Sequence, residues 1–137
     1  MSEPISDLTI LLSTLEPRLT QGVYVFALAP AGTDGRDLPV LATFQEAEGL
    51  TVILKEEDAQ AAGLAALFRA AWITLTVHSD LQAVGLTGAF ATALAEAGIS
   101  CNVVAAAFHD HIFVPVEAAE KALEALRKLQ KSAANQC

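Results

Sequence analysis

A polar turn lies between an expected strand and an expected helix in residues 77–87. The turn contains His78, Ser79 and Asp80, and the helix follows within a few residues. The first amides of a helix have no partner within the helix and carry the positive end of its dipole, so they suit a carboxylate. Ser79 and Asp80 could hold an ammonium group beside them. This corner could therefore recognise the constant part of an amino acid; alternatively, Ser79 or Asp80 only caps the helix.

The triplet His109-Asp110-His111 is the other conspicuous polar group. Two histidines two residues apart in an extended chain point to the same side, so they could bind one metal ion. Without an anchored third donor, however, such a metal site is incomplete. We favour a tight turn at His109-Asp110 in which Asp110 bonds backbone amides. A contact with a ligand or with a partner is the third interpretation.

Motifs of other chemistries are missing from the sequence. It contains no glycine-rich nucleotide loop, no serine nucleophile elbow and no paired-cysteine zinc motif. Gly85 and Gly88 are interpreted as close packing at a helix start. Cys101 is expected to be a buried structural thiol, because no neighbouring cation would lower its pKa. We therefore expect no enzyme activity, no cofactor and no metal.

Composition limits the partners of the chain. Of its 137 residues, 53% are hydrophobic and 18% charged, which is typical of a folded domain and not of a disordered chain. Eight basic against sixteen acidic residues give a net charge of −8, so nucleic acid and anionic membranes are not expected partners. The sequence shows neither a membrane-spanning run nor a signal peptide, and its two cysteines cannot form a disulfide framework. These features predict a cytoplasmic protein.

The first half of the chain is expected to fold mainly as strands. Leu8, Leu11, Leu12 and Leu15 form one stripe of a short helix that ends before Pro17. β-Branched and aromatic runs predict strands, and an alanine-rich run predicts a helix. The expected elements are a helix at 5–15, strands at 22–28, 39–44 and 50–54, and a helix at 56–67.

The second half alternates strands and helices. The expected elements are strands at 72–77, 99–107 and 112–116, and helices to residue 97 and at 117–129, followed by a frayed tail from Lys131. This order is the split βαβ pattern without its last strand, which the first half could supply. The first half in turn lacks a crossover helix. Glu57 and Glu117, like Ala59 and Ala119, match at a common offset of 60, which suggests two related units.

Two segments carry a resemblance to a known family. The run from His78 to Val103, with its Val-Gly turn and its Ala-Gly-Ile, resembles an ACT domain such as those in the regulatory part of aspartate kinase. The segment His109-Asp-His-Ile-Phe-Val-Pro115 resembles a small stand-alone bacterial family of tandem ACT-like units. The match covers about residues 72–129, and the first half matches more weakly at 41–44 and 48–50.

The resemblance implies an α+β, ferredoxin-like (βαββαβ) fold in two related units that pack together or share a sheet. The units would be residues 1–68 and 69–137. An amino-acid effector would bind at the strand–helix loop near a domain interface. Family members often have a tyrosine before His-Asp-His, where this chain has Ala107-Phe108. The implied ligand-binding residues are Ser79, Asp80, Ala83, Val84, Gly85, Leu86 and Asn102.

We therefore expect a non-catalytic regulatory protein that binds an amino acid and forms a homodimer or larger assembly. Exposed sheet edges of a ferredoxin-like unit favour such pairing. One alternative is a structural or partner-binding ACT-type protein without a ligand. The other is a metal-binding protein that uses His109 and His111.

Overall fold

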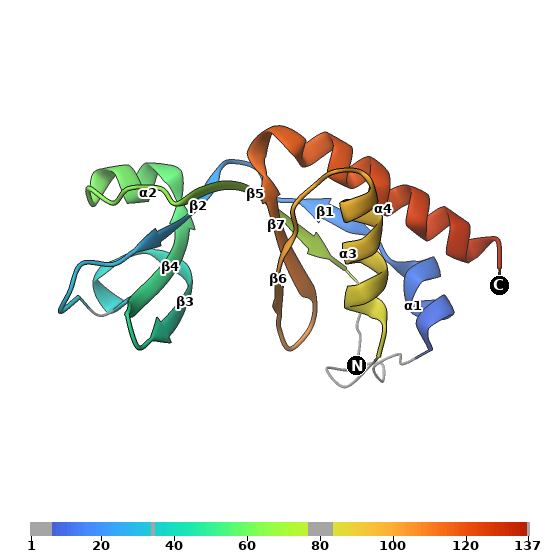
Figure 1. Ribbon diagram of the computed structural model, residues 1–137, viewed down its shortest axis with the longest axis horizontal. Helices are drawn as coiled ribbons and strands as arrows, with labels where there is room; N and C mark the ends of the chain where they lie inside the picture. The colour runs from blue at the N-terminus through green and yellow to red at the C-terminus, as the bar shows by residue number, and fades with distance from the viewer. Residues whose placement is uncertain (1–6, 34, 77–83, 137) are drawn as a thin grey trace. The chain divides into compact units, whose positions relative to one another are not determined.

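The computed structural model describes residues 7–33, 35–76 and 84–136 (Figure 1). The chain forms two compact units. One unit takes in the chain up to Thr20 and again from Trp72, and we call it the split unit. The other is Gln21–Ala71, and we call it the inserted unit because it interrupts the first along the chain. Within the described ranges, no helix is both long and apolar enough to cross a membrane.

The inserted unit is an antiparallel sheet with one helix. Its strands are β2 (Tyr24–Leu28), β3 (Val40–Glu46), β4 (Gly49–Lys55) and the first part of β5 (Phe68–Leu75), in the order β3-β4-β2-β5. A 3₁₀ turn, η1 (Gly35–Asp37), stands between β2 and β3, where a ferredoxin-like unit would have its first crossover helix. The helix α2 (Glu56–Ala61) follows β4 directly. The absence of a crossover helix between β2 and β3 agrees with the sequence, which predicted none in the first half.

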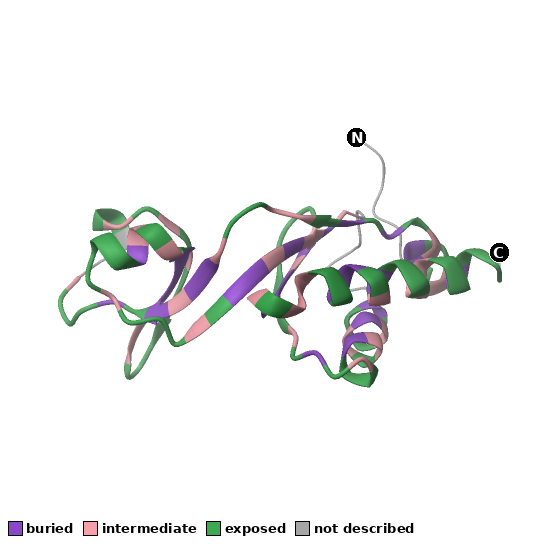
Figure 2. Cartoon of the chain, turned by 90° about the horizontal axis from the view of Figure 1, so that it is seen from above, coloured by how far each residue is buried: buried purple, intermediate pink, exposed green. Residues whose placement is uncertain are grey.

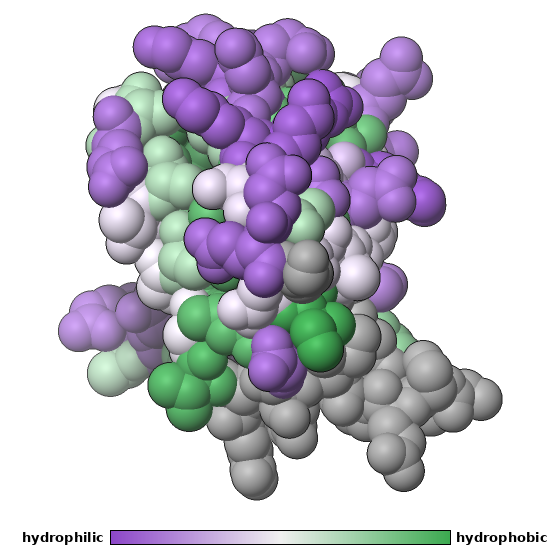
Figure 3. Space-filling model, turned by 90° about the vertical axis from the view of Figure 1, so that its right-hand side faces the viewer, coloured by the Kyte–Doolittle hydropathy of each residue, from purple (hydrophilic) through white to green (hydrophobic). Residues whose placement is uncertain are grey.

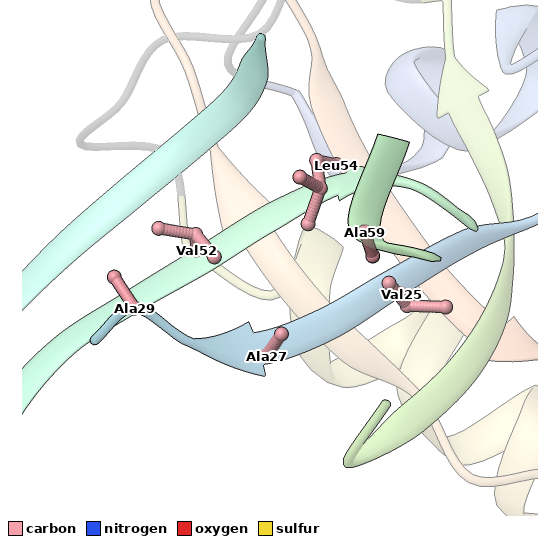
Figure 4. Close-up of a cluster of buried hydrophobic side chains, with 6 residues drawn as sticks. All are labelled: Val25, Ala27, Ala29, Val52, Leu54 and Ala59. Carbon is pink, nitrogen blue, oxygen red and sulfur yellow. The ribbon is translucent and has the colours of Figure 1, made fainter. Parts of the chain in front are cut away.

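Small aliphatic side chains form the core of the inserted unit. Every second residue of β2 and β4 points to α2, as the alternation of a strand requires. Figure 4 shows these side chains gathered under Ala59 of α2. Their small size lets α2 lie close to the sheet. The cluster comprises Val25, Ala27, Ala29, Val52, Leu54 and Ala59.

The split unit has the strand order β1-β5-β7-β6. Its strands are β1 (Pro17–Leu19), the second part of β5, β6 (Asn102–Ala105) and β7 (Asp110–Pro115). β1 pairs antiparallel with β5, with Pro17 opposite Leu75 and Leu19 opposite Ile73. The first strand of the chain thus completes the second βαββα pattern, and the α+β, ferredoxin-like fold is confirmed.

Three α-helices belong to the described part of the split unit. They are α1 (Leu8–Thr14), α3 (Leu86–Glu96) and α4 (Ala119–Ala134), the last preceded by the 3₁₀ turn η2 (Val116–Ala118). α4 contacts both α1 and α3. Its buried residues recur along one side, as Figure 2 shows, while Figure 3 shows hydrophilic side chains gathered on the upper part of the face that carries it. The largest fully buried side chains of this unit include Leu11, Ile73, Phe90, Leu94, Ile112 and Leu126.

Some element boundaries differ from the expected ones. The helix expected at 56–67 ends at Ala61, because Gly63 takes a positive φ of 72° and the chain turns there. The tail from Lys131 is not frayed: α4 continues to Ala134, and Ala133 is buried. The helix expected soon after Asp80 begins only at Leu86.

The division at residue 68 concerns sequence units and stays a prediction. The compact units have other boundaries than this division. α1 and β1 come before residue 68 in the chain, but they pack with the second half, within the split unit. β5 contributes to both units: Phe68–Ala70 pair with β2, whereas Ile73–Leu75 pair with β1.

Candidate functional site

The candidate corner at the start of α3 is described in part. Ser79, Asp80 and Ala83 lie outside the described residues. Val84 is 85% exposed, whereas Leu86, two residues later, is buried as the first residue of α3. The structure therefore gives the helix end of the corner but not its acidic turn.

Gly85 is the N-cap of α3 and has a left-handed conformation with φ of 98°. A Cβ atom here would lie 3.1 Å from Cδ2 of Leu8 in α1, so a larger residue would meet both backbone strain and this side chain. Because glycine has no side chain, it cannot cap the first amides of α3. The N-cap of α3 is thus Gly85, and the capping alternative for Ser79 or Asp80 falls on residues that the structure does not describe.

Asn102 opens the edge strand β6 and lies opposite Phe113 of β7. Its side chain is exposed, and Nδ2 donates a 3.4 Å hydrogen bond to the Phe113 carbonyl oxygen. Phe113 in turn stacks on Trp72, with ring centroids 6.3 Å apart. Asn102 is therefore level with Trp72 on β5, some residues before the point where β5 leads toward α3. Among the described residues, no hydrogen bond connects it to Val84, Gly85 or Leu86.

The polar triplet is not a turn at His109-Asp110. The turn comes earlier: the Ala106 amide donates to the His109 carbonyl oxygen over 3.1 Å, and Asp110 is already the first residue of β7, opposite Ala105. The expected turn is thus correct in kind but misplaced. The sequence could not fix its place, because alanine and phenylalanine at 107 and 108 carry no turn signal.

His111 is held by two side chains of β5. Trp72 Nε1 donates to His111 Nδ1 over 3.0 Å, and Thr74 Oγ1 lies 3.1 Å from the same atom. An indole N–H can only donate, so Nδ1 must accept and the proton of the neutral ring sits on Nε2. Burial, and then the neighbouring His109, lowers the pKa of His111, while Asp110 opposes this. His111 is therefore a neutral, structurally engaged imidazole.

Asp110 is the buried charged residue of the described chain, with 6% of its surface exposed. Burial raises the pKa of its carboxyl, although His111 and His109 both act to lower it. Nδ1 of His109 is also buried and has no hydrogen-bond partner. This burial could not be predicted from the sequence, because a triplet of polar residues beside a turn normally indicates exposure.

The described residues add no third ligand to the metal site that His109 and His111 could form. The parts of the chain that the structure describes contain no group of three or more histidine, cysteine, aspartate or glutamate residues able to hold a metal ion. Burial raises the pKa of the Cys101 thiol to about 11, which disfavours the reactive thiolate. At neutral pH the thiol is protonated, although Cys101 is only half-buried and not buried as expected.

Sequence comparison matches both halves of the chain to one domain type. The ACT domain matches residues 3–71 in one version and residues 68–128 in another. The chain belongs to the ACT domain family. Tandem ACT units were expected from the second half above all, and the first half is now matched along its whole length. ACT domains regulate and do not catalyse, so the chain is a regulatory ACT protein.

Known structures agree with this assignment. A Vibrio cholerae protein of unknown function, described as a possible transport protein, is 52% identical with a TM-score of 0.81 over 90% of this chain and 95% of that one. The ligand-free regulatory subunit of aspartate kinase from Thermus thermophilus is 15% identical, with a TM-score of 0.63 over 85% and 96% of the two chains. Escherichia coli aspartokinase III with aspartate and ADP is 12% identical, with a TM-score of 0.59 over 82% and 32%. The two aspartate kinase structures show that they share the fold of this chain. No curated protein matches the sequence.

Proposed function

We propose that this ACT protein binds a free amino acid at the corner where β5 leads into α3, and that it has no catalytic activity of its own. The observation that carries the proposal is the start of α3, where the N-cap is Gly85, which itself supplies no side-chain cap to the first amides of the helix. Such amides favour a carboxylate. An ACT unit with this feature is suited to recognise the constant part of an amino acid.

The ammonium group of the ligand needs an acceptor of opposite charge. The sequence offers Asp80, which precedes Gly85 by five residues. Asn102 offers an amide that can donate to a carboxylate and accept from an ammonium. Asn102 is exposed on an edge strand, so it is accessible to a ligand held between two ACT units.

A second copy of the chain is the proposed partner. β6 is an edge strand of the split unit, and residues 102–108 contain no charged side chain. Val104 is 38% and Phe108 60% exposed. Edge strands usually carry charges, prolines or bulges that prevent pairing, and this strand has no such residue. Pairing through β6 would bring Asn102 to an interface between copies.

The inserted unit supports a second candidate function, that of a partner-binding domain without a ligand. Phe44 is 71% and Leu28 54% exposed. Both lie opposite Thr51 of β4, on the side of the sheet that faces away from α2, so they form one apolar face. Apolar exposure of this kind is typical of interaction surfaces.

Titration calorimetry with the twenty standard amino acids, tested one at a time, separates the two functions. The ligand function requires saturable binding of at least one amino acid. Asp80→Ser and Asn102→Ala should then each weaken binding roughly ten- to hundredfold, the cost of a hydrogen bond to a charged group. Serine keeps the size of a small polar residue but cannot pair with an ammonium. Wild-type affinity in both variants would place the site elsewhere, and no binding at all would favour the partner-binding function.

A further inference from the structure

One face of the sheet in the split unit is only half-buried. Along β5 the exposure alternates: Ile73 and Leu75 are fully buried, like Phe90 of α3, whereas Trp72 and Thr74 are half-buried. Side chains alternate along a strand, so Trp72 and Thr74 share one face and the two core residues share the other. We call the face that carries Trp72 and Thr74 the open face.

Three neighbouring strands place side chains of the open face in one row. Arg18 of β1 lies opposite Thr74 of β5, and Thr74 Oγ1 lies 3.1 Å from Nδ1 of His111 on β7. Directly opposed residues of antiparallel strands share a face, with their Cβ atoms about 4.5–5.5 Å apart. Arg18, Thr74 and His111 therefore follow one another across the sheet, with Thr74 in the middle.

Arg18 brings a positive charge to this row. Its side chain is exposed and forms no ion pair with any residue that the structure describes, Glu16 two residues earlier included. The other lysines and arginines in the described part of the split unit all belong to α4. A guanidinium presents a planar fork of N–H groups that matches the two oxygens of a carboxylate.

His111 adds a hydrogen-bond donor on the other side of Thr74. Its Nδ1 accepts from Trp72 Nε1, so the proton of the neutral ring is on Nε2. None of the described residues accepts a hydrogen bond from Nε2. Nε2 is not among the buried atoms without a partner, so this N–H is accessible to a ligand.

An aromatic surface lies beside the row. Trp72 comes two residues before Thr74 on the same face, about 6.6 Å along the strand. Its ring stacks on Phe113 with centroids 6.3 Å apart and an interplanar angle of 20°. This stacking and the bond to His111 hold the indole in place. The exposed part of the indole offers apolar area to a further ring.

We propose that the open face binds a small carboxylic acid that carries an aromatic ring. The carboxylate lies over Thr74, where it accepts paired hydrogen bonds from Arg18 and one from His111 Nε2. The ring lies against Trp72. This site is distinct from the amino-acid site at the start of α3, and the inference does not rest on the proposed function. The three contacts recognise a carboxylate and a ring, so the ligand needs no ammonium group.

Trp72 is the single tryptophan of the chain, so its fluorescence reports directly on the open face. The probe is 3-phenylpropionate, whose short arm separates the carboxylate from the ring. It should change the emission of Trp72 saturably. Its uncharged amide and propionate, which has no ring, should each bind at least tenfold more weakly. Phenylalanine is the same acid with an added ammonium, and it should bind to the open face no more tightly than 3-phenylpropionate.

Two matched variants test the role of the guanidinium. Arg18→Gln should weaken the binding of 3-phenylpropionate at least tenfold, the usual effect of losing a hydrogen bond to a charged group. Arg127→Gln, an exposed change on α4, should keep the wild-type affinity. In the wild type, the nitrogen-15 signal of His111 Nε2 should move when 3-phenylpropionate binds. This last measurement needs no variant and so does not depend on the folding of Arg18→Gln.

The contrary results are equally specific. Equal binding of the acid and its amide, wild-type affinity in Arg18→Gln, or an unmoved His111 signal would overturn the inference. Tighter binding of phenylalanine than of 3-phenylpropionate would also overturn it and would favour the amino-acid site instead. If millimolar 3-phenylpropionate leaves the emission unchanged, the inference fails while the proposed function stands. If 3-phenylpropionate binds as described and no amino acid binds, the inference stands and the proposed function fails.

Discussion

Among single residues, Gly85 has the least freedom to change. Its φ of 98° is left-handed, and a Cβ would lie 3.1 Å from Leu8 Cδ2. We expect Gly85→Ala to cost about 1–2 kcal/mol of unfolding free energy, the usual cost of a left-handed L-residue. The matched control is Gly88→Ala, because Gly88 lies inside α3 with nothing within 4 Å of the added Cβ. This control should gain roughly 0.5–1 kcal/mol.

Urea denaturation of the three proteins checks this prediction. Equal effects of the two substitutions would show that the glycines are equivalent and that Gly85 is not a required N-cap. Because Leu8 is the neighbour involved, Leu8→Ala combined with Gly85→Ala separates the contact from the strain. The double variant should recover the part of the loss that is due to the Leu8 contact and keep the part that is due to φ.

His111 should make the stability depend on pH. Burial, followed by His109, lowers its folded pKa below the ordinary value of 6.5, so the unfolded chain binds more protons between the two values. The stabilisation of the folded state by neutral His111 is therefore complete above pH 6.5. It is lost as the pH falls from 6.5 through the folded pKa. Asp110 contributes a pH dependence of the opposite sign. Its raised pKa stabilises the folded state at low pH, and this stabilisation is lost as the pH rises above 3.8.

Melting curves of the wild type and His111→Gln between pH 7.5 and pH 5 isolate this contribution. Asp110 is present in both proteins, so the difference between the two curves reports His111 except for its effect on Asp110. The wild type should lose more stability on acidification than the variant. Parallel curves would contradict the neutral His111 inferred from the Trp72 and Thr74 contacts.

At the scale of elements, α1 is attached to α4 by one specific bond. Gln130 Nε2 donates to the Ser13 carbonyl oxygen over 2.7 Å at the end of α1. Gln130→Ala should cost about 0.5–1.5 kcal/mol, the net value of a typical hydrogen bond. It should also speed hydrogen exchange in α1 more than in α3. Gln60→Ala, an exposed change on α2, is the control, and equal exchange of α1 in both variants would exclude this role.

The elements also show how far the sequence leads. The order of strands and helices along the second half, and its missing last strand, could be predicted from periodicity, because residues near in sequence determine them. That β1 fills the gap depends on the pairing of Pro17 with Leu75, which local patterns do not contain. The late start of α3 was missed because Ser79 and Asp80 are good cap residues, whereas the structure uses Gly85.

The candidate site was harder to predict than the fold. The resemblance pointed to Gly85 and Leu86, which stand at the start of α3, and their part in ligand binding stays a prediction. The burial of Asp110 and the contacts of His111 with β5 arise from the packing of strands that are more than thirty residues apart in the chain. Such contacts could be suspected only from the matching alternation of Trp72-x-Thr74 and His111-x-Phe113.

For the whole molecule, the assembly state follows from the edge strands. We expect light scattering to give a multiple of the 14.3 kDa chain mass, because β6 offers an uncharged edge. Val104→Lys would place a charge on this edge and should shift the mass toward 14.3 kDa. Thr43→Lys on β3, the edge strand of the inserted unit, should leave the mass unchanged. The reverse pattern would place the interface on β3.

The central claim is that the folded protein binds an amino acid, and thermal unfolding of the full chain tests it most directly. A ligand that binds only the folded state stabilises it by RT ln(1 + [L]/Kd), about 2.7 kcal/mol at a hundredfold excess over Kd. With each of the twenty standard amino acids added singly, at least one should raise the melting temperature by several degrees, and its 2-hydroxy acid should raise it less. Unchanged melting temperatures with all twenty, at concentrations up to the millimolar range, would contradict the account.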